Sequence, residues 1–404
     1  MSAILSGVRV LDFCWIGAGA LVTQTLALHG AEVIKIESRH RPDGLRLSPP
    51  YRPGTSGLEA SGYFASRNAG KKSFALNMSH PDGPATARRL LDSCSVLTSN
   101  YRPGVLERWG LDYDRIAPER PDLIFLSMPM QGEKGPHRDY LGFGSTIAAL
   151  SGLVAPSGLP GRTPIGTGTH YPDHVPNPGH ALVALLAAML YRKRTGRGGR
   201  IELAQFESTV NMVGPSVIAN SATGFEPEPA GNHTADRTPR GVYPCLGTEQ
   251  WCAISVADQA QWTALCQALD LPGLADDVRF ATPEDRRANE HELDQRIGWA
   301  TARFDAHELA QTLQARGVPA SRVQSPADVL DDPVLAGRGY WHVREHAVIG
   351  SLRVAAGPYV WSDGDMAPAT PAPLLGADTE QLARDLLGLD RDEVARLVEQ
   401  GLLQ

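Results

Sequence analysis

Short apolar runs alternate with helical patterns in the first third of the chain. Residues 8–13 (VRVLDF) and 31–37 (AEVIKIE) each have the continuous apolar character of a strand buried in a parallel sheet. Further strands are predicted at residues 73–76, 96–98 and 123–127, with helices over 84–93 and 105–109. Because strands and helices alternate, we expect an α/β fold built on a parallel sheet.

The clearest helical pattern covers residues 179–194. This segment is apolar from residue 181 to residue 190, basic in its last turn and followed by Gly196, a common helix stop. A strand is predicted over residues 200–204. The composition then shifts to glycine, proline, threonine and charge around residues 222–240, which indicates a linker.

The pattern after the linker predicts a smaller α+β region. A hairpin is expected over residues 242–256, and helices are expected over 259–269, 284–301 and 306–316. Strands around 347–354 and a helical region over 380–402 follow. We therefore expect a Rossmann-like large domain from 1–221, a linker and small α+β domain from 222–330, and a return to the large domain from 331–404.

Composition narrows the function classes. The 404 residues are 42% apolar and 21% charged, as in globular proteins, with a net charge of −7 and no basic block that would favour nucleic acid or a membrane surface. The N-terminus lacks a signal-peptide pattern and no apolar run reaches membrane-spanning length. Five cysteines without metal-ligand spacing indicate free thiols in a reducing, cytoplasmic setting, so no metal is expected.

A glycine-containing loop follows the first predicted strand. Gly17 and Gly19, with Glu37 ending the second strand, imitate a dinucleotide-binding fingerprint, but Val22 takes the place of the third glycine. Two interpretations remain open at this point. The loop is either a tight strand–helix turn without a nicotinamide, or a set of backbone N–H groups suited to another phosphate-bearing ligand.

A further signal lies in segments at residues 6–13, 18–19, 30–37, 68–78, 100–114, 189–208, 316–323 and 372–379. In this order they resemble the class III CoA-transferases of the CaiB/BaiF type, which include formyl-CoA transferase and carnitine CoA-transferase. The resemblance implies a Rossmann-like large domain, a small domain inserted through linkers, and a dimer of interlocked ring-shaped chains. It also implies acyl-CoA and carboxylic acids as substrates, with no permanently bound cofactor.

The resemblance assigns the nucleophile to Asp173, just before the long predicted helix. A carboxylate beside a helix N-terminus is favoured in its charged form, and only the anion attacks a thioester. The implied intermediates are an aspartyl–acyl anhydride and an aspartyl-CoA thioester. Taken alone, an aspartate here is also a common N-cap. His170 and His174 flank it and are expected to have positioning or surface roles, while glycines at 17 and 142–144 are candidate oxyanion donors.

The resemblance also implies a set of CoA contacts. Arg39 would supply a charge that formyl-CoA transferase places at the position of Ser38. The other residues that match the family's CoA contacts are Ile16, Ala18, Lys71, Lys72, Leu76, Asn100, Tyr101 and Arg108.

Other functions remain as alternatives. A 2-methylacyl-CoA racemase shares the fold but needs a proton-transferring histidine where Phe143 stands. The chain could instead be the active subunit of a hetero-oligomeric CoA-transferase, or, less in keeping with Val22, a nicotinamide oxidoreductase. Within the family, several segments resemble enzymes that use succinyl-CoA and aromatic succinates such as benzylsuccinate. An apolar neighbourhood of Trp15, Tyr140 and Phe143 would suit a phenyl ring.

Overall fold

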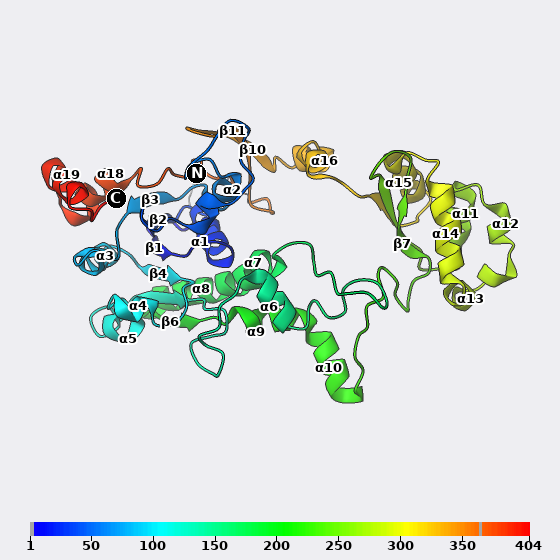
Figure 1. Cartoon of the computed structure of the whole chain (residues 1–404), viewed down its shortest axis with the longest axis horizontal. Helices are drawn as coiled ribbons and strands as arrows, with labels where there is room; N and C mark the ends of the chain where they lie inside the picture. The colour runs from blue at the N-terminus through cyan, green and yellow to red at the C-terminus, as the bar shows by residue number, and fades with distance from the viewer. Residues whose placement is uncertain (1–3, 363–365) are drawn as a thin grey trace. The chain divides into compact units, whose positions relative to one another are not determined.

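The computed structural model describes residues 4–362 and 366–404, and the chain forms two compact units (Figure 1). The large unit contains Met1–Ala155, Ile165–Pro227 and Pro333–Gln404. The small unit contains Glu228–Asp332 together with the short segment Pro156–Pro164. The large unit is therefore discontinuous in sequence.

A six-stranded sheet forms the centre of the large unit, and all of its neighbouring strands are parallel. The strand order is β3-β2-β1-β4-β5-β6. The strands are β1 Arg9–Phe13, β2 Glu32–Glu37, β3 Lys72–Ala75, β4 Val96–Ser99, β5 Ile124–Ser127 and β6 Gly199–Glu202. The predicted parallel α/β sheet is confirmed. The order reverses between β1 and β4, and ligands bind α/β sheets at the carboxyl ends of strands flanking such a reversal.

Helices cover both faces of the sheet. Neighbouring residues along a strand point to opposite faces, so they enter two different cores. Val10 belongs to one apolar core with side chains of α1 (Ala18–Leu28) and α8 (Pro176–Thr195). Leu11 belongs to the other core, with side chains of α3 (Gly83–Asp92), α18 (Thr379–Leu387) and α19 (Arg391–Glu399). The continuous apolar strands of the sequence are thus explained by helices on both sides.

The remaining elements of the large unit are short. A β-hairpin pairs β10 (Trp341–His346) with β11 (Gly350–Ala355). The helices are α2 Gly62–Asn68, α4 Val105–Arg108, α5 Tyr113–Ile116, α6 Gly144–Leu150, α7 Tyr171–His174, α9 Gln205–Val210, α10 Gly214–Thr223 and α17 Pro333–Gly337, with 3₁₀ turns at Gly44–Leu47 and Asn211–Val213. The helical region expected over 380–402 consists of two helices, since Gly388 takes a left-handed conformation and separates α18 from α19.

The small unit has its own sheet and its own core. The antiparallel order is β7-β8-β9, and the predicted β7–β8 hairpin is confirmed. The expected helix over 284–301 was wrong, because the backbone of Asn289 departs from helical geometry between α13 and α14. The elements are β7 Arg240–Pro244, β8 Trp251–Ser255, β9 Ala320–Arg322, α11 Gln259–Ala268, α12 Pro272–Ala275, α13 Pro283–Ala288, α14 Glu290–Thr301, α15 Ala306–Ala315 and α16 Pro326–Leu330, with a 3₁₀ turn at Val278–Phe280.

Among the helices of residues 4–362 and 366–404, none has both the length and the apolar character that a bilayer crossing requires.

Candidate active site

A cavity of about 430 Å³ opens at the carboxyl ends of β1, β2 and β4, and we name it the edge cavity. Three of the predicted CoA contacts, Leu76, Tyr101 and Arg108, line it. The complete lining is Phe13, Trp15, Ile36, Glu37, Ser38, His40, Arg41, Leu76, Asn77, Met78, Ser79, Tyr101, Arg102, Val105, Arg108 and Trp109. This is where the strand order predicts a ligand site.

A second cavity, of about 410 Å³, contains Asp173 in its wall, and we name it the Asp173 cavity. Four predicted contacts, Ile16, Ala18, Asn100 and Tyr101, also line it. The Asp173 cavity and the edge cavity share Trp15, Tyr101 and Arg102. A molecule lying along these shared side chains would reach from the carboxyl ends of the strands to the Asp173 carboxylate.

Asp173 lies in the single turn of α7, ahead of the first residue of α8, Pro176. Its side chain is only 8% exposed. Burial raises its pKa to about 6, although the charge of His170 and a hydrogen bond from the backbone N–H of Gly144 both lower it. Burial disfavours the charged form of the carboxylate, and this effect is the largest of the three. The N-cap of α8 is Val175 and has no side-chain cap, so Asp173 does not cap that helix.

Two glycines border the Asp173 carboxylate. A Cβ atom at Gly17 would lie 2.7 Å from Asp173 Oδ2, and one at Gly144 would lie 2.6 Å from the same atom. Cβ atoms essentially never approach oxygen this closely. There is therefore no room for a side chain at position 17 or position 144 while Asp173 keeps this conformation. The two positions lie at the starts of α1 and α6.

The histidines beside Asp173 differ in environment. His174 is half-buried, and its Nδ1 lies 3.3 Å from the guanidinium of Arg67. Burial lowers the pKa of His174 to about 4, and the charges of Arg67 and His170 lower it further. His174 is therefore neutral at physiological pH and accepts from Arg67. His170 is exposed.

Asn100 has a structural task in this site. Its Oδ1 accepts the Trp15 N–H at 2.9 Å, and its Nδ2 donates to the Trp15 carbonyl at 2.6 Å. Both ends of the amide are therefore bonded to one residue of the β1–α1 loop.

The lysines predicted to hold CoA line neither cavity. Lys71 is buried, where its Nζ lies 3.2 Å from Asp12 and 3.0 Å from the carbonyl of Ala20. Lys72, the first residue of β3, is half-buried, and its Nζ lies 2.7 Å from Glu32 of the neighbouring strand β2. Their charges are thus paired within the protein.

Other cations face the edge cavity. Arg39 is exposed and does not line it, whereas its neighbours Ser38, His40 and Arg41 do. Arg102 lines both cavities. Sequence reasoning missed Arg41 and Arg102, although Arg102 directly follows the predicted Tyr101.

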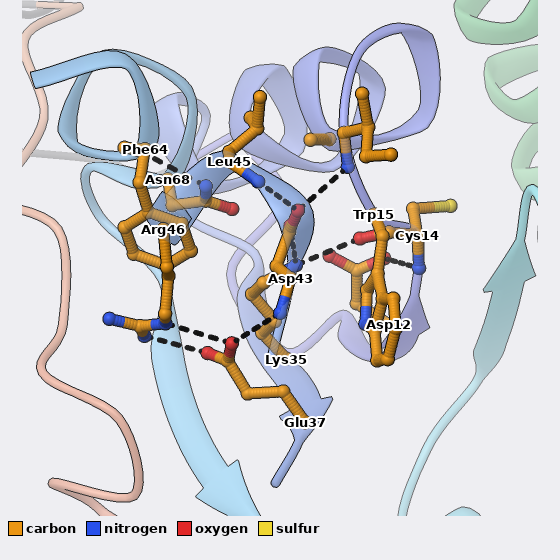
Figure 2. A network of polar contacts seen from close by, with 12 residues as sticks. Asp12, Cys14, Trp15, Lys35, Glu37, Asp43, Leu45, Arg46, Phe64 and Asn68 are labelled. Carbon is orange, nitrogen blue, oxygen red and sulfur yellow. Dashed lines mark hydrogen bonds and ion pairs between the residues drawn. The ribbon is translucent and has the colours of Figure 1, made fainter. Parts of the chain in front are cut away.

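Glu37 does not serve as a ribose ligand in this structure. Its carboxylate makes a bidentate pair with buried Arg46, with Nε–Oε2 and Nη2–Oε1 distances of 2.8 Å and 2.7 Å (Figure 2). A carboxylate held in this way has its acceptor positions occupied. The arrangement favours the tight strand–helix turn over a nicotinamide site.

The loop before α6 supplies one wall of the Asp173 cavity. Tyr140, Leu141 and Phe143 are 54%, 74% and 62% exposed, and Arg138 stands beside them. No histidine is among the described residues that line this cavity. Sequence reasoning missed Arg138.

Within residues 4–362 and 366–404, no group of three or more His, Cys, Asp or Glu side chains could hold a metal ion. All five cysteines are buried free thiols.

Comparisons with known proteins agree with this geometry. A model of CoA-transferase family III matches residues 5–379. The chain is 32% identical to the probable CoA-transferase Rv1866 of Mycobacterium tuberculosis, over 98% of this chain but about half (50%) of that protein's length. It is 31% identical to the succinyl-CoA–D-citramalate CoA-transferase of Chloroflexus aurantiacus, over 97% of this chain and 96% of that one.

A solved structure gives the same result for the fold. A CaiB/BaiF family protein from Brucella suis superposes with a TM-score of 0.88 at 28% identity, covering 96% of this chain and 100% of that one. The chain belongs to CoA-transferase family III, and the enzyme class expected from its motifs is confirmed.

Proposed function

We propose that the enzyme transfers coenzyme A from an acyl-CoA to a carboxylic acid, with Asp173 as the covalent nucleophile. One observation carries the proposal. The Asp173 carboxylate lies in the wall of a cavity that shares Trp15, Tyr101 and Arg102 with the edge cavity. A nucleotide in the edge cavity could then extend its thioester along these residues to Asp173.

The proposed reaction consists of four acyl exchanges. Asp173 attacks the donor thioester carbonyl, an oxygen–carbon bond forms, and CoA leaves as a thiolate. The thiolate attacks the Asp173 side-chain carbonyl of the resulting anhydride, which releases the donor acid and forms an aspartyl-CoA thioester. The acceptor carboxylate attacks this thioester and displaces the thiolate again. The thiolate then attacks the acceptor's carbonyl, which gives the new acyl-CoA and regenerates Asp173.

The surroundings of Asp173 suit this role. A pKa of about 6 leaves most of the carboxylate ionised at neutral pH. Because Asp173 is largely buried, few water molecules have to be removed from the carboxylate before it attacks. The N-terminus of α1 and the Gly144 N–H lie at the same cavity. We assign backbone donors there to the oxyanions that develop in each exchange.

The edge cavity supplies groups that suit a CoA nucleotide. Arg41, Arg102 and Arg108 offer charge for phosphates, and Trp15 and Trp109 offer aromatic faces for the adenine. We propose Ile16, Ala18 and Tyr101 as contacts along the shared wall.

For the substrates we propose succinyl-CoA as donor and an aromatic succinate such as benzylsuccinate as acceptor. The Chloroflexus relative is named for succinyl-CoA, which supports the donor. The exposed Tyr140, Leu141 and Phe143 suit a phenyl group, and Arg138 offers a counter-charge for a second carboxylate.

We further propose a cytoplasmic, interlocked dimer, formed with a second copy or a related subunit. Large apolar side chains stand exposed on α8 and α10, including Val183 and Ile218 at 70% each. Patches of this kind on a folded surface mark contacts with other chains. Light scattering would give the mass of the assembly.

Covalent trapping tests the function directly. The protein is incubated with succinyl-CoA, acetyl-CoA or glutaryl-CoA, hydroxylamine is added, and modified peptides are mapped by mass spectrometry. A hydroxamate on Asp173 is expected with the true donor, and the donor's identity narrows the substrate.

Asp173→Asn is the matched control, because it keeps the size of the side chain and removes the nucleophile. No hydroxamate should appear at position 173 in this variant. An unmodified Asp173 with every donor, in a protein shown to bind CoA, would contradict the proposed mechanism.

A further inference from the structure

The backbone of the β1–α1 loop is held by side chains from several strands. The Cys14 N–H donates to Asp12 Oδ1 at 2.9 Å, and the Cys14 carbonyl accepts from Lys35 Nζ at 2.9 Å. Asn100 forms hydrogen bonds with both the backbone N–H and the backbone carbonyl of Trp15. The loop is therefore fixed at consecutive residues before it reaches Gly17.

Ile16 has an unusual conformation in this loop. Its φ angle is +61°, in the left-handed region, which a β-branched residue rarely adopts. Such a conformation persists only where the surroundings determine it, and it is found most often at functional sites. Gly17, the next residue, is the one that borders the Asp173 carboxylate.

Asp43 provides the bond that fixes Ile16. Its Oδ1 accepts the Ile16 N–H at 3.0 Å, and its Oδ2 lies 2.7 Å from Lys35 Nζ (Figure 2). The Asp43 N–H in turn donates to Glu37 Oε2 at 3.3 Å. The side chains of Asp43 and Lys35 are fully buried, so no water competes for these bonds.

We propose that Asp43 and Lys35 are positioning residues for CoA transfer: their buried pair holds Ile16 in its left-handed conformation and so presents Gly17 to the Asp173 carboxylate. Neither residue lines the Asp173 cavity, so each acts through the loop. The inference rests on the proposed function of Asp173 and adds the device that sets its geometry.

Two substitutions at position 43 separate the hydrogen bond from the charge. Asp43→Asn and Asp43→Ala both deprive Lys35 of its carboxylate, so both should lower the melting temperature. Only alanine also removes the acceptor for the Ile16 N–H, together with that for the Leu45 N–H, which bonds the same oxygen at 3.0 Å. We expect kcat to fall about 100-fold in Asp43→Ala and less than tenfold in Asp43→Asn, with KM for the acyl-CoA within about threefold of wild type in both.

Glycine at position 16 provides a rescue, because glycine adopts positive φ without steric cost. In the Ile16→Gly background, Asp43→Ala should lower kcat about tenfold rather than about 100-fold. An equal loss in both backgrounds would overturn the proposal. Leu90→Ala, in the core at the other face of the sheet, serves as the control that lowers stability without touching the loop.

A second readout does not need CoA transfer. Carbodiimide labelling of Asp173, mapped by mass spectrometry, should be several-fold faster in Asp43→Ala than in wild type and unchanged in Leu90→Ala. Equal labelling in all three proteins would overturn the positioning role. If wild type transfers CoA from no donor, the proposed function fails, while the labelling ratio still decides this inference.

Discussion

Asp173 and Gly17 are matched by shape: the carboxylate Oδ2 lies 2.7 Å from the point where a Cβ of residue 17 would stand. Gly17 has a φ of −76° and a ψ of −95°. The neighbouring carboxylate alone already requires glycine here, because it occupies the space that a Cβ would need. A Cβ at Gly144 would lie 2.6 Å from the same oxygen, so position 144 has the same requirement.

Gly17→Ala should displace Asp173 and lower kcat about 100-fold, because small displacements of a reacting group are costly. Gly179→Ala is the matched control, since nothing lies within 4 Å of a Cβ at position 179. That change should leave kcat unaltered and raise stability by about 1 kcal/mol, as expected for glycine in a helix. Steady-state kinetics of both variants decide the point, and equal activity would contradict it.

The pH dependence of turnover should follow the ionisation of Asp173. Its pKa is raised to about 6 and the anion is the attacking form, so kcat/KM should fall about tenfold for each pH unit below 6. Rates measured from pH 5 to pH 8 would show this limb. A rate that stays constant down to pH 5 would count against ionisation of Asp173 as the controlling step.

Asp173→Asn should stabilise the protein at high pH. With a folded-state pKa above the ordinary value of 3.8, the folded protein binds a proton that the unfolded chain lacks between pH 3.8 and 6, so stability falls as pH rises through this window. Above pH 6 the buried charge costs about 2–3 kcal/mol. Urea unfolding should show the variant more stable at pH 8 and the difference shrinking toward pH 5. A difference that stays constant with pH would argue against a buried charge.

Arg108 and Lys72 should differ in their effect on CoA binding. Arg108→Met removes a cation from the edge cavity and should raise KM for the acyl-CoA about tenfold, equivalent to about 1.4 kcal/mol. Lys72 is paired with Glu32 outside both cavities, so Lys72→Met should leave KM within about twofold. A larger rise of KM in Lys72→Met than in Arg108→Met would instead indicate that Lys72 contacts CoA.

Arg138 should affect the choice of acceptor. If it pairs with the second carboxylate of a diacid, Arg138→Gln should lower kcat/KM for a dicarboxylate about tenfold or more and leave a monocarboxylate of similar size nearly unchanged. Competition between the two acceptors in one assay measures the ratio directly. Equal losses for both acids would exclude this role.

The parallel sheet was predictable because its signal is local. The central strands β1, β2, β4 and β5 are buried on both faces, and therefore they read as short, mainly apolar runs, as in residues 8–13. The break between α13 and α14 was not predictable in the same way. The amphipathic pattern continues across Asn289, and only the backbone there shows that the helix ends.

The charges of the site could not be assigned from local sequence. Lys71 and Lys72 are adjacent, yet Lys71 is paired with Asp12, which is 59 positions away, and Lys72 with Glu32. The raised pKa of Asp173 likewise depends on burial beside Gly17 and Gly144, which are distant in sequence. Such pairings are set by the fold, and spacing along the chain does not reveal them.

The edge of the sheet is completed by residues far along the chain. On the edge strand β3, the Ser73 N–H donates to Asp378 Oδ2 at 2.8 Å, and the Ala75 N–H donates to Thr379 Oγ1 at 2.8 Å. During synthesis, the whole small unit must emerge before these partners exist. The nascent chain therefore carries an open strand edge for most of its translation, a period in which exposed edges invite aggregation and chaperone binding.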